Sequence, residues 1–221
     1  TKIGANDVDA LAGAITGGSF TEAAKSGTNV ALLKEGLVFP ATAVNGYYTV
    51  IDDPSTHYIY NLNDLKAFRD AVNGGESYKG VTVYLGANID LGNNEWTPIG
   101  NSTNKFQGIF DGQDYTISNL VITGNNNDVG LFGFTTNGEI KNLTVNNAKV
   151  SGRLNVGVVA GTPYTYKYTN IKVTGHVEVN GMAYVGGVGG KNAYANWTDV
   201  TVAVDETSCV YANSVENGIA Y

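Results

Sequence analysis

The chain is poor in cysteine, in proline and in charged residues. Its 221 residues include one cysteine, Cys209, and four prolines, and only 15% are Asp, Glu, Lys or Arg. One cysteine excludes an internal disulfide and a zinc site built from several cysteines. Secreted eukaryotic proteins of this size usually carry paired cysteines, so the sequence favours a bacterial source. No apolar run approaches the roughly 18 residues of a membrane helix, so no transmembrane segment is predicted.

Basic residues are scarce as well. Thirteen Lys and Arg stand against 20 Asp and Glu, which gives a net charge of −7. This balance argues against nucleic acid and against anionic membranes as partners, because both attract basic patches. Solubility is the plainer reason for such mild acidity. The abundant residues are glycine, with 29 copies, and tyrosine, with 14, a composition that suits strands and tight turns.

Two phrases recur along the second half of the chain. The first is a glycine phrase, found as VGLFGF from Val129, VGVVAG from Val156, VGGVGG from Val185 and, in degenerate form, NGIAY from Asn217. The second places Asn or Asp before an apolar residue, and its copies are Ser118–Ile122, Lys141–Val145, Thr169–Val173 and Thr198–Val202. Successive glycine phrases are 27 and 29 residues apart. Self-similarity at this period predicts a stacked architecture.

We therefore expect an all-β solenoid, a right-handed parallel β-helix in which each turn lies about 4.8 Å from the previous one. The handedness follows from the usual chirality of parallel crossovers. Apolar residues at helical spacing predict N-terminal capping α-helices over residues 7–16 and 63–73. Asn63 is the expected N-cap of the second helix, and Gly74 with Gly75 its stop.

The chain divides at about residue 57. Residues 1–57 are expected to form an N-terminal helix and strand capping segment, and residues 58–221 the parallel β-helix repeat region, within one continuous domain. The C-terminal end shows no helix that could cover it. We therefore expect that the chain is a fragment of a longer protein or that its last turn pairs with a partner.

The Asx position of the second phrase has an expected structural role. One residue from each turn would stack into a ladder of hydrogen-bonded side chains: Asn119, Asn142, Asn170 and Asp199. This reading assigns the ladder to the fold rather than to ligand binding.

Residues 58–221 resemble the β-helical bacterial surface proteins that carry the GLUG repeat. The resemblance is carried by six motifs in order: Tyr60–Phe68, Ala87–Leu91, Trp96–Gly100, Phe106–Gly112, Thr116–Leu120 and Gly130–Gly133. Later glycine phrases depart from it, since Gly157 is followed by Val-Val-Ala and Gly186 by Gly-Val-Gly. The resemblance implies an exported cell-surface protein with an adhesin-like or other binding role, often within a long multidomain chain, and no catalytic residues.

Carboxylates on neighbouring turns are the expected tools of a polysaccharide-active β-helix enzyme. The candidates are Asp90, Asp111, Asp114 and Glu139. Asp111 precedes a glycine, as in an ordinary turn, and the arginines lie elsewhere, at positions 69 and 153. We therefore assign no catalytic residue and expect no enzyme, with a polysaccharide lyase or hydrolase as the alternative.

Metal-binding patterns are weak. His57 and His176 stand alone in the sequence, so no metal site is assigned. No cofactor is expected, although Asp52–Asp53 or the loop from Asn125 to Asp128 could hold a weak calcium ion through its oxygens. Cys209 is expected to act as a small buried apolar residue.

The strongest candidate for ligand binding is a group of aromatic residues. Tyr164, Tyr166 and Tyr168 alternate, so they would point to one side of a strand. Tyr194 follows Tyr166 by 28 residues, and Trp197 lies beside it. Five rings on adjacent turns could form a flat patch on which sugar rings stack or a peptide anchors. The alternative is that they cover a sheet face or meet another domain.

These observations predict an extracellular or cell-surface adhesin-like module, without catalytic activity, that presents its solenoid surface to a glycan or to a host or other extracellular protein. A structural stalk within a larger surface protein is the second hypothesis, and the polysaccharide-active enzyme is the third. A broad array of glycans and matrix proteins would separate the first two.

Overall fold

The computed structural model describes residues 54–164 and 166–213, and outside them only the backbone of six two-residue strands. These strands are β1 (Ser19–Phe20), β2 (Leu37–Val38), β3 (Tyr48–Thr49), β4 (Ile51–Asp52), β18 (Val215–Glu216) and β19 (Ile219–Ala220). The chain separates into two compact units, Thr1–His57 and Tyr58–Tyr221. In the first unit, β1 pairs with β3 and β2 with β4, both antiparallel. The helix expected over residues 7–16 lies outside the described residues.

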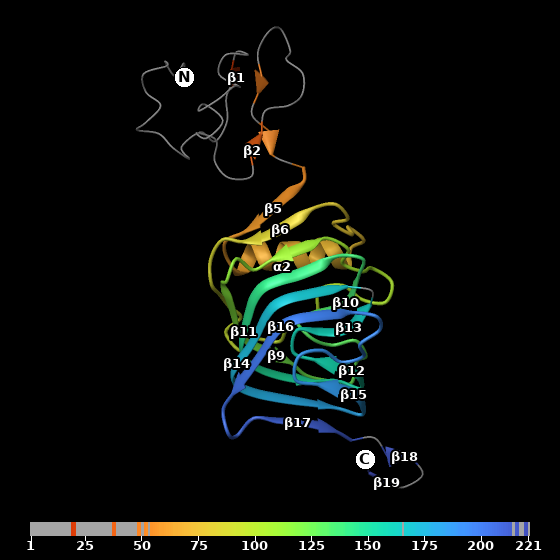
Figure 1. The fold of residues 1–221 in the computed structure, drawn as a ribbon. Helices are drawn as coiled ribbons and strands as arrows, with labels where there is room; N and C mark the ends of the chain where they lie inside the picture. Colours follow the sequence, from red (N-terminus) through yellow and green to blue (C-terminus); the bar gives the residue numbers. More distant parts are fainter. Residues whose placement is uncertain are drawn as a thin grey trace. The chain divides into compact units, whose positions relative to one another are not determined.

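The second unit is a β-solenoid of about six turns, built mainly from parallel strands (Figure 1). Its first face runs from β5 (Thr56–Ile59) through β6 (Thr82–Leu85), β8 (Ile109–Asp111), the first halves of β11 (Glu139–Ser151) and β14 (Lys167–Gly181), to β16 (Asn196–Val204). Partners one turn apart include Thr82 with Ile109, Glu139 with Lys167, and Lys167 with Asn196. The predicted parallel stacking of equivalent segments is confirmed, while its handedness stays a prediction.

Two further groups of strands complete the wall. The second face contains β7 (Ile89–Asp90), β9 (Thr116–Ile122), the second halves of β11 and β14, and β17 (Cys209–Ala212). The third contains the pair β10 (Phe132–Thr136) and β13 (Ala160–Tyr164), and the pair β12 (Leu154–Gly157) and β15 (Ala183–Gly186). The recurring glycines lie where backbones of adjacent turns nearly touch. A Cβ on Gly130 would lie 2.5 Å from the carbonyl oxygen of Gly157, so no side chain fits there.

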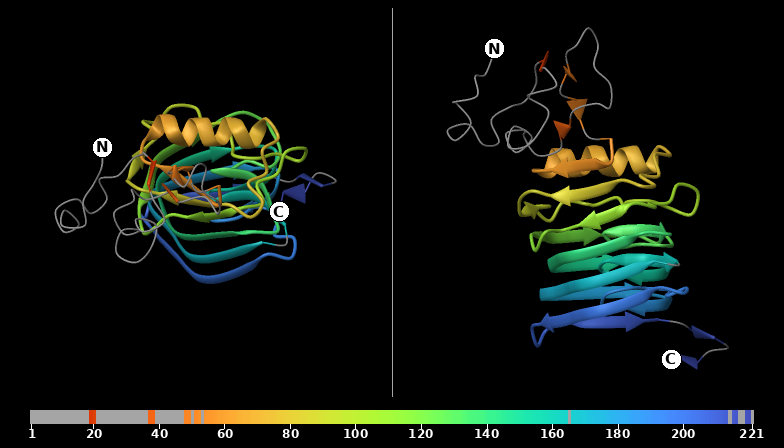
Figure 2. Two further views of the ribbon diagram at one scale, coloured as in Figure 1. Left: turned by 90° about the horizontal axis from the view of Figure 1, so that it is seen from above. Right: turned by 45° about the horizontal axis from the view of Figure 1, so that its top comes forward.

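Helix α2 (Leu62–Asn73) lies at the N-terminal end of the stacked turns of this unit (Figure 2). Its N-cap is Asn61, so the prediction of Asn63 was wrong. The Asn61 Oδ1 accepts hydrogen bonds from the backbone N–H groups of Asn63, at 2.9 Å, and Asp64, at 3.0 Å. The helix ends at Asn73, and Gly74 is its C-cap, so the predicted stop is confirmed. Its apolar face, formed by Leu65, Phe68 and Val72, is fully buried in the core of the unit.

The core is a set of apolar columns that run along the solenoid axis. Leu143 stands in register with Ile171, and Val145 with Val173, and all four are at most 1% exposed. Near α2 the columns turn aromatic. The rings of Phe106 and Phe132 have centroids 5.6 Å apart, and those of Phe110 and Phe132 lie 5.2 Å apart and nearly perpendicular.

The four residues predicted to form a single column belong to two separate ladders. Asn142, Asn170 and Asp199 occupy equivalent positions in register, because their neighbours pair one turn apart. Each has a positive φ, from 51° to 53°, which Asn and Asp tolerate better than other side chains with a Cβ. Asn119 lies instead on the second face. Its neighbours pair with Asn146 and Ala148, and its side chain therefore meets the bulge residue Asn147, whose Nδ2 donates to the Asn119 Oδ1 at 3.3 Å.

Candidate functional site: a polar pocket on the solenoid wall

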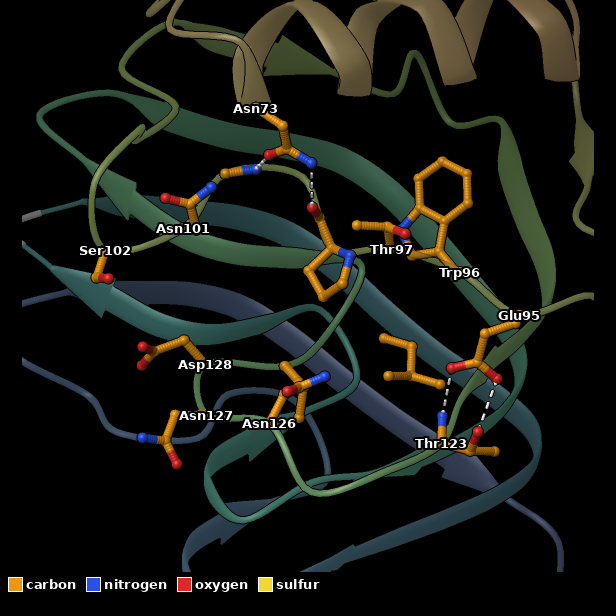
Figure 3. Close-up of a pocket in the computed structure, with 14 residues that line it drawn as sticks. Asn73, Glu95, Trp96, Thr97, Asn101, Ser102, Thr123, Asn126, Asn127 and Asp128 are labelled. Carbon is orange, nitrogen blue, oxygen red and sulfur yellow. Dashed lines mark hydrogen bonds between the residues drawn. The ribbon is translucent and has the colours of Figure 1, made fainter.

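A pocket of about 560 Å³ opens on the wall of the solenoid between two successive turns (Figure 3). One side comes from the segment between β7 and β8, around residues 95–102, and the other from the loop after β9, residues 122–129. Asn73, at the C-terminal end of α2, closes one margin. The two segments belong to adjacent turns, since Glu95 bridges to Val121 and Ile99 to Phe132.

Side-chain hydrogen bonds fix both walls of the pocket. The Glu95 carboxylate accepts from the Thr123 backbone N–H at 2.7 Å and from the Thr123 hydroxyl at 2.9 Å. The Asn73 Oδ1 accepts from the backbone N–H of Gly100 at 2.8 Å, and its Nδ2 donates to the carbonyl of Pro98 at 3.0 Å. These bonds tie neighbouring turns together, so the pocket has a preformed shape.

The opposite margin is held by Asp128. Its Oδ1 accepts hydrogen bonds from the Asn155 Nδ2, at 2.7 Å, and from the Thr162 hydroxyl. Both donors come from the following turn. Asp128 and Asn155 also share a positive φ, near 58°. The carboxylate therefore anchors the loop.

The remaining lining offers hydrogen-bonding groups beside apolar surface. Among the described residues, no intramolecular hydrogen bond is made by the side chains of Ser102, Asn126 or Asn127, and the two asparagines are exposed. Trp96, Pro98, Ile122 and Val129 supply the apolar part of the lining. Amides and hydroxyls beside aliphatic surface match a neutral, hydroxyl-rich ligand, whose O–H groups bond while its C–H faces pack.

The predicted aromatic patch is not formed, because two of its five members point into the core. Tyr166 and Tyr168 are 2% and 0% exposed. The Tyr166 hydroxyl donates to the carbonyl of Gly108 at 2.6 Å, and the Tyr168 hydroxyl bonds the Thr135 hydroxyl at 2.7 Å. Burial raises the pKa of both phenols. The prediction was wrong because Tyr164 ends β13, Tyr166 lies between the strands and Tyr168 belongs to β14, so strand alternation does not relate the three.

The other three aromatic residues lie in two places. Trp197 stacks on the buried Tyr168, with centroids 4.0 Å apart and planes 17° apart, one turn further along. Tyr164 and Tyr194 are 43% and 82% exposed, and their rings meet edge to face at 6.0 Å. The Phe134 ring adjoins Tyr164 at 6.4 Å and is tilted by 40°. These planes differ too much to form the flat platform that was expected.

The carboxylates weighed for catalysis are engaged in the structure. The Asp111 Oδ1 accepts from the Asn142 Nδ2 at 3.0 Å, and its Oδ2 lies 3.4 Å from the Lys141 Nζ. The Asp90 Oδ1 accepts from the Asn119 Nδ2 at 2.8 Å and from the backbone N–H of Gly92 at 2.7 Å. These hydrogen bonds lower the pKa of Asp90. Asp90 and Asp111 therefore take part in the ladders of hydrogen-bonded side chains.

His176 is not isolated, contrary to the sequence-based expectation. Its Nε2 lies 3.1 Å from a Glu178 carboxylate oxygen, and its Nδ1 lies 3.2 Å from Asp205. The hydrogen bonds to Glu178 and Asp205 raise the pKa of His176. Hydrogen bonds lower the pKa of Asp205 to about 2, the largest coming from Thr207. Within residues 54–164 and 166–213, no group of three or more His, Cys, Asp or Glu side chains is arranged to hold a metal ion.

The sequence did not reveal the pocket, because its lining comes from irregular segments between the strands. One signal was available. The Asn-rich run from Asn125 to Asp128 falls between two strand phrases, where a solenoid places its variable loops. Strict use of the 28-residue period would also have led from Asn142 back to Asp114, whose φ is 59°, rather than to Asn119.

Comparison with known proteins gives one informative similarity. The chain is 37% identical over 173 residues to the protein named halomucin from Haloquadratum walsbyi, and the match covers 74% of this chain. The matched segment spans only 2% of halomucin, so that relative is many times longer than this chain. No known protein family profile matches the sequence. No solved structure matches it either. No helix in the described part of the chain is long and apolar enough to cross a membrane.

Proposed function

We propose that this chain is an exported, non-catalytic module of a long cell-surface protein, and that it binds a glycan in the pocket between residues 95–102 and 122–129. The observation that carries the proposal is the composition of that pocket, where unpaired amides and a hydroxyl stand beside aliphatic surface on hydrogen-bonded walls. Similarity to one short section of halomucin supports the setting, because a repeat module suits a very long chain. The GLUG-repeat resemblance stays a prediction.

The charge of the pocket narrows the class of ligand. Among the residues that the structure describes, its lining includes the carboxylates of Glu95 and Asp128 and contains no lysine or arginine. An anionic sugar would meet repulsion there, so a neutral oligosaccharide is the ligand class proposed. The hydrogen bonds that hold both carboxylates in the walls support a binding role over catalysis.

An array of neutral and acidic glycans and of extracellular matrix proteins tests the proposal, followed by calorimetry on the best ligand. The Ser102→Ala/Asn127→Ala variant is expected to weaken binding at least tenfold, by about 1.4 kcal/mol or more, since each change removes a free polar group. Asn125→Ala is the matched control. Asn125 is an exposed asparagine of the same loop that does not line the pocket. Equal loss in the control, or preference for acidic glycans, would contradict the site.

The same array separates the alternatives. Cleavage of a bound glycan that disappears in Glu95→Gln would contradict the non-catalytic proposal and support an enzyme. If only proteins and no glycans bind on the array, the binding surface lies outside the pocket. The exposed Tyr164 and Tyr194 are then the first residues to test. We also propose that no cofactor takes part, so EDTA should leave the affinity unchanged. Loss of binding that calcium restores would assign a cation to the loop before Val129.

A structural stalk is the second candidate function, and one observation favours it. The last strands of the solenoid expose apolar residues that continue the core columns, as Val202 continues Val173. A structural stalk is built by adding further turns to the solenoid, and these exposed positions would accept such a turn. Absence of any ligand on the array would favour this candidate over the glycan-binding module.

A further inference from the structure

The strands β16 and β17 expose side chains that belong to the core. Val200 and Val202 are in register with Ile171 and Val173, which are fully buried one turn earlier. Yet Val200 is 37% exposed and Val202 is 51% exposed. On β17, Val210 is 48% exposed, although its partner Val179 is fully buried. Inward-facing positions are thus left open on two faces of the solenoid.

The backbone of this edge is equally open. Among the described strands, β16 and β17 each pair with β14 alone, so one side of each strand has no partner there. Natural sheets protect such edges with charged residues, proline or bulges. The thirteen residues of these two strands contain one charged side chain, Asp199, and no proline. The edge therefore has the composition of an interior strand pair.

The amide ladders of the solenoid have a direction. In each, an asparagine donates its Nδ2 hydrogen to an acceptor on the turn before it. Three ladders begin in this way at an aspartate: Asn119 to Asp90 at 2.8 Å, Asn142 to Asp111 at 3.0 Å and Asn155 to Asp128 at 2.7 Å. The next rung can be another asparagine, as when Asn170 donates to the Asn142 Oδ1 at 3.1 Å. An aspartate is therefore the first rung of a ladder, because an ionised carboxylate only accepts.

Asp199 occupies a ladder position but cannot donate to the preceding turn as the asparagines do. It stands above Asn170 with the same left-handed backbone, at φ 53°, but its carboxylate has no hydrogen to give to the preceding turn. Asp128 has the same left-handed backbone, at φ 57°, and accepts from Asn155 of the next turn, so by this pattern Asp199 is the acceptor for an asparagine one turn further on.

We infer that the β16–β17 edge is covered by a further turn of the same repeat, carried in series by the same polypeptide, in parallel register and with an asparagine over Asp199. A further parallel turn accounts for three features together: the apolar columns left exposed, the strand edge with a single charged residue, and Asp199, which can only accept a hydrogen bond. An antiparallel second copy would cover the edge, but it would not bring the equivalent asparagine of a parallel turn over Asp199. The inference does not depend on glycan binding.

The test adds such a turn and measures amide hydrogen exchange. A copy of residues 161–182 is fused after Tyr221, which aligns Gly218 with Gly157 of the glycine phrase and brings the copied Asn170 to the ladder position. Exchange of the β16 amides is expected to slow at least tenfold, with β11 amides unchanged as the internal reference. A copy with its residues in scrambled order is the control for length and composition.

The ladder itself is tested by a second fusion, in which the copied asparagine carries the Asn170→Asp change. Two carboxylates would then face each other, so most of the protection of β16 should be lost. Equal protection by the native and scrambled copies, or none by the native copy, would overturn the inference. Dimerisation of the unextended chain in sedimentation, with β16 amides protected as concentration rises, would overturn it in favour of a second copy.

Discussion

The two ends of the solenoid unit differ in how they finish the same apolar columns. At the first end, α2 covers them with Leu65, Phe68 and Val72, all fully buried. At the other end, Val200, Val202 and Val210 continue the columns but are 37–51% exposed. The repeat dictates which side chains point inward, but burial depends on the next layer. Identical strand patterns can thus lie in a finished core or at an open edge.

The largest expected effect lies at the covered end. Phe110→Ala removes a ring that is fully buried and contacts Phe68 and Phe132, with centroids at 6.0 and 5.2 Å. We expect the free energy of unfolding to fall by about 3–5 kcal/mol, measured by urea denaturation. Tyr211→Ala, at a ring 57% exposed near the open end, is the comparison and should cost less than about 1 kcal/mol. Similar losses at the two sites would remove the distinction between the ends.

A register-matched pair sharpens the same comparison. Val173 and Val202 are partners on neighbouring turns, fully buried and 51% exposed respectively. Val173→Ala should lower the free energy of unfolding by about 2 kcal/mol, and Val202→Ala by less than about 0.5 kcal/mol. In the fusion that carries an added turn, the cost of Val202→Ala should approach that of Val173→Ala. A large cost in the unextended chain would mean that this edge is already covered.

The cap of α2 gives a smaller effect. Asn61→Ala removes the side chain that accepts from two N–H groups in the first turn, and should cost about 1 kcal/mol in thermal or urea unfolding. Asn63→Ala is the control, since Asn63 lies within the helix, where alanine is the better helix former. This variant should be as stable as the parent protein or slightly more so. A larger loss of stability in Asn63→Ala than in Asn61→Ala would instead identify Asn63 as the N-cap.

The smallest effect concerns His176, which links β14 to the loop before β17. Glu178 and Asp205 face its ring, together with the Thr207 hydroxyl, and Lys149 of β11 pairs with Glu178 at 2.9 Å. The pKa of His176 is raised, so its stabilising contribution is complete below about pH 6.5 and disappears as the pH rises through that raised value. The pKa values of Glu178 and Asp205 are lowered, so their contribution is complete above about pH 4.5 and disappears as the pH falls through those lowered values.

Hydrogen exchange of the β17 amides measures this contribution. His176→Gln should speed exchange at about pH 5.5 and have little effect at about pH 9, after correction for the intrinsic exchange rate. A difference between variant and parent that is constant with pH would show that the charge of His176 does not hold this loop.

The sequence predicted the strands that repeat from turn to turn more accurately than the bends between strands within one turn. The phrases around Leu143, Ile171 and Val200 identified strands that pair one turn apart, because inward-facing residues recur at a fixed period. Tyr164 and Tyr166 were placed on one face because alternation was continued through a corner of the chain. The position of Asn119 was misassigned because similar local phrases occur on two different walls.

The pocket lay beyond sequence reasoning for a different reason. Its walls are irregular segments from adjacent turns, held by long-range bonds such as that from Thr123 to Glu95. Glu95 and Thr123 lie one repeat period apart, at 28 residues, but Ser102 and Asn127 belong to irregular segments that carry no repeated phrase, so only the fold shows that they line one pocket. His176 and Asp205 also lie one repeat period apart, at 29 residues, and meet because they occupy successive turns, but neither belongs to a repeated phrase that would have marked the pair.

The register of adjacent turns is the basis of every conclusion above, and an engineered disulfide measures it directly. In a Cys209→Ser background, Thr144→Cys with Lys172→Cys places two thiols on partnered residues of β11 and β14, a geometry that a disulfide can bridge. Thr144→Cys with Thr174→Cys, two residues out of register, is the control. Rapid oxidation of the first pair and not of the second is the predicted result. Preferential bridging of the out-of-register pair would contradict the stacked arrangement.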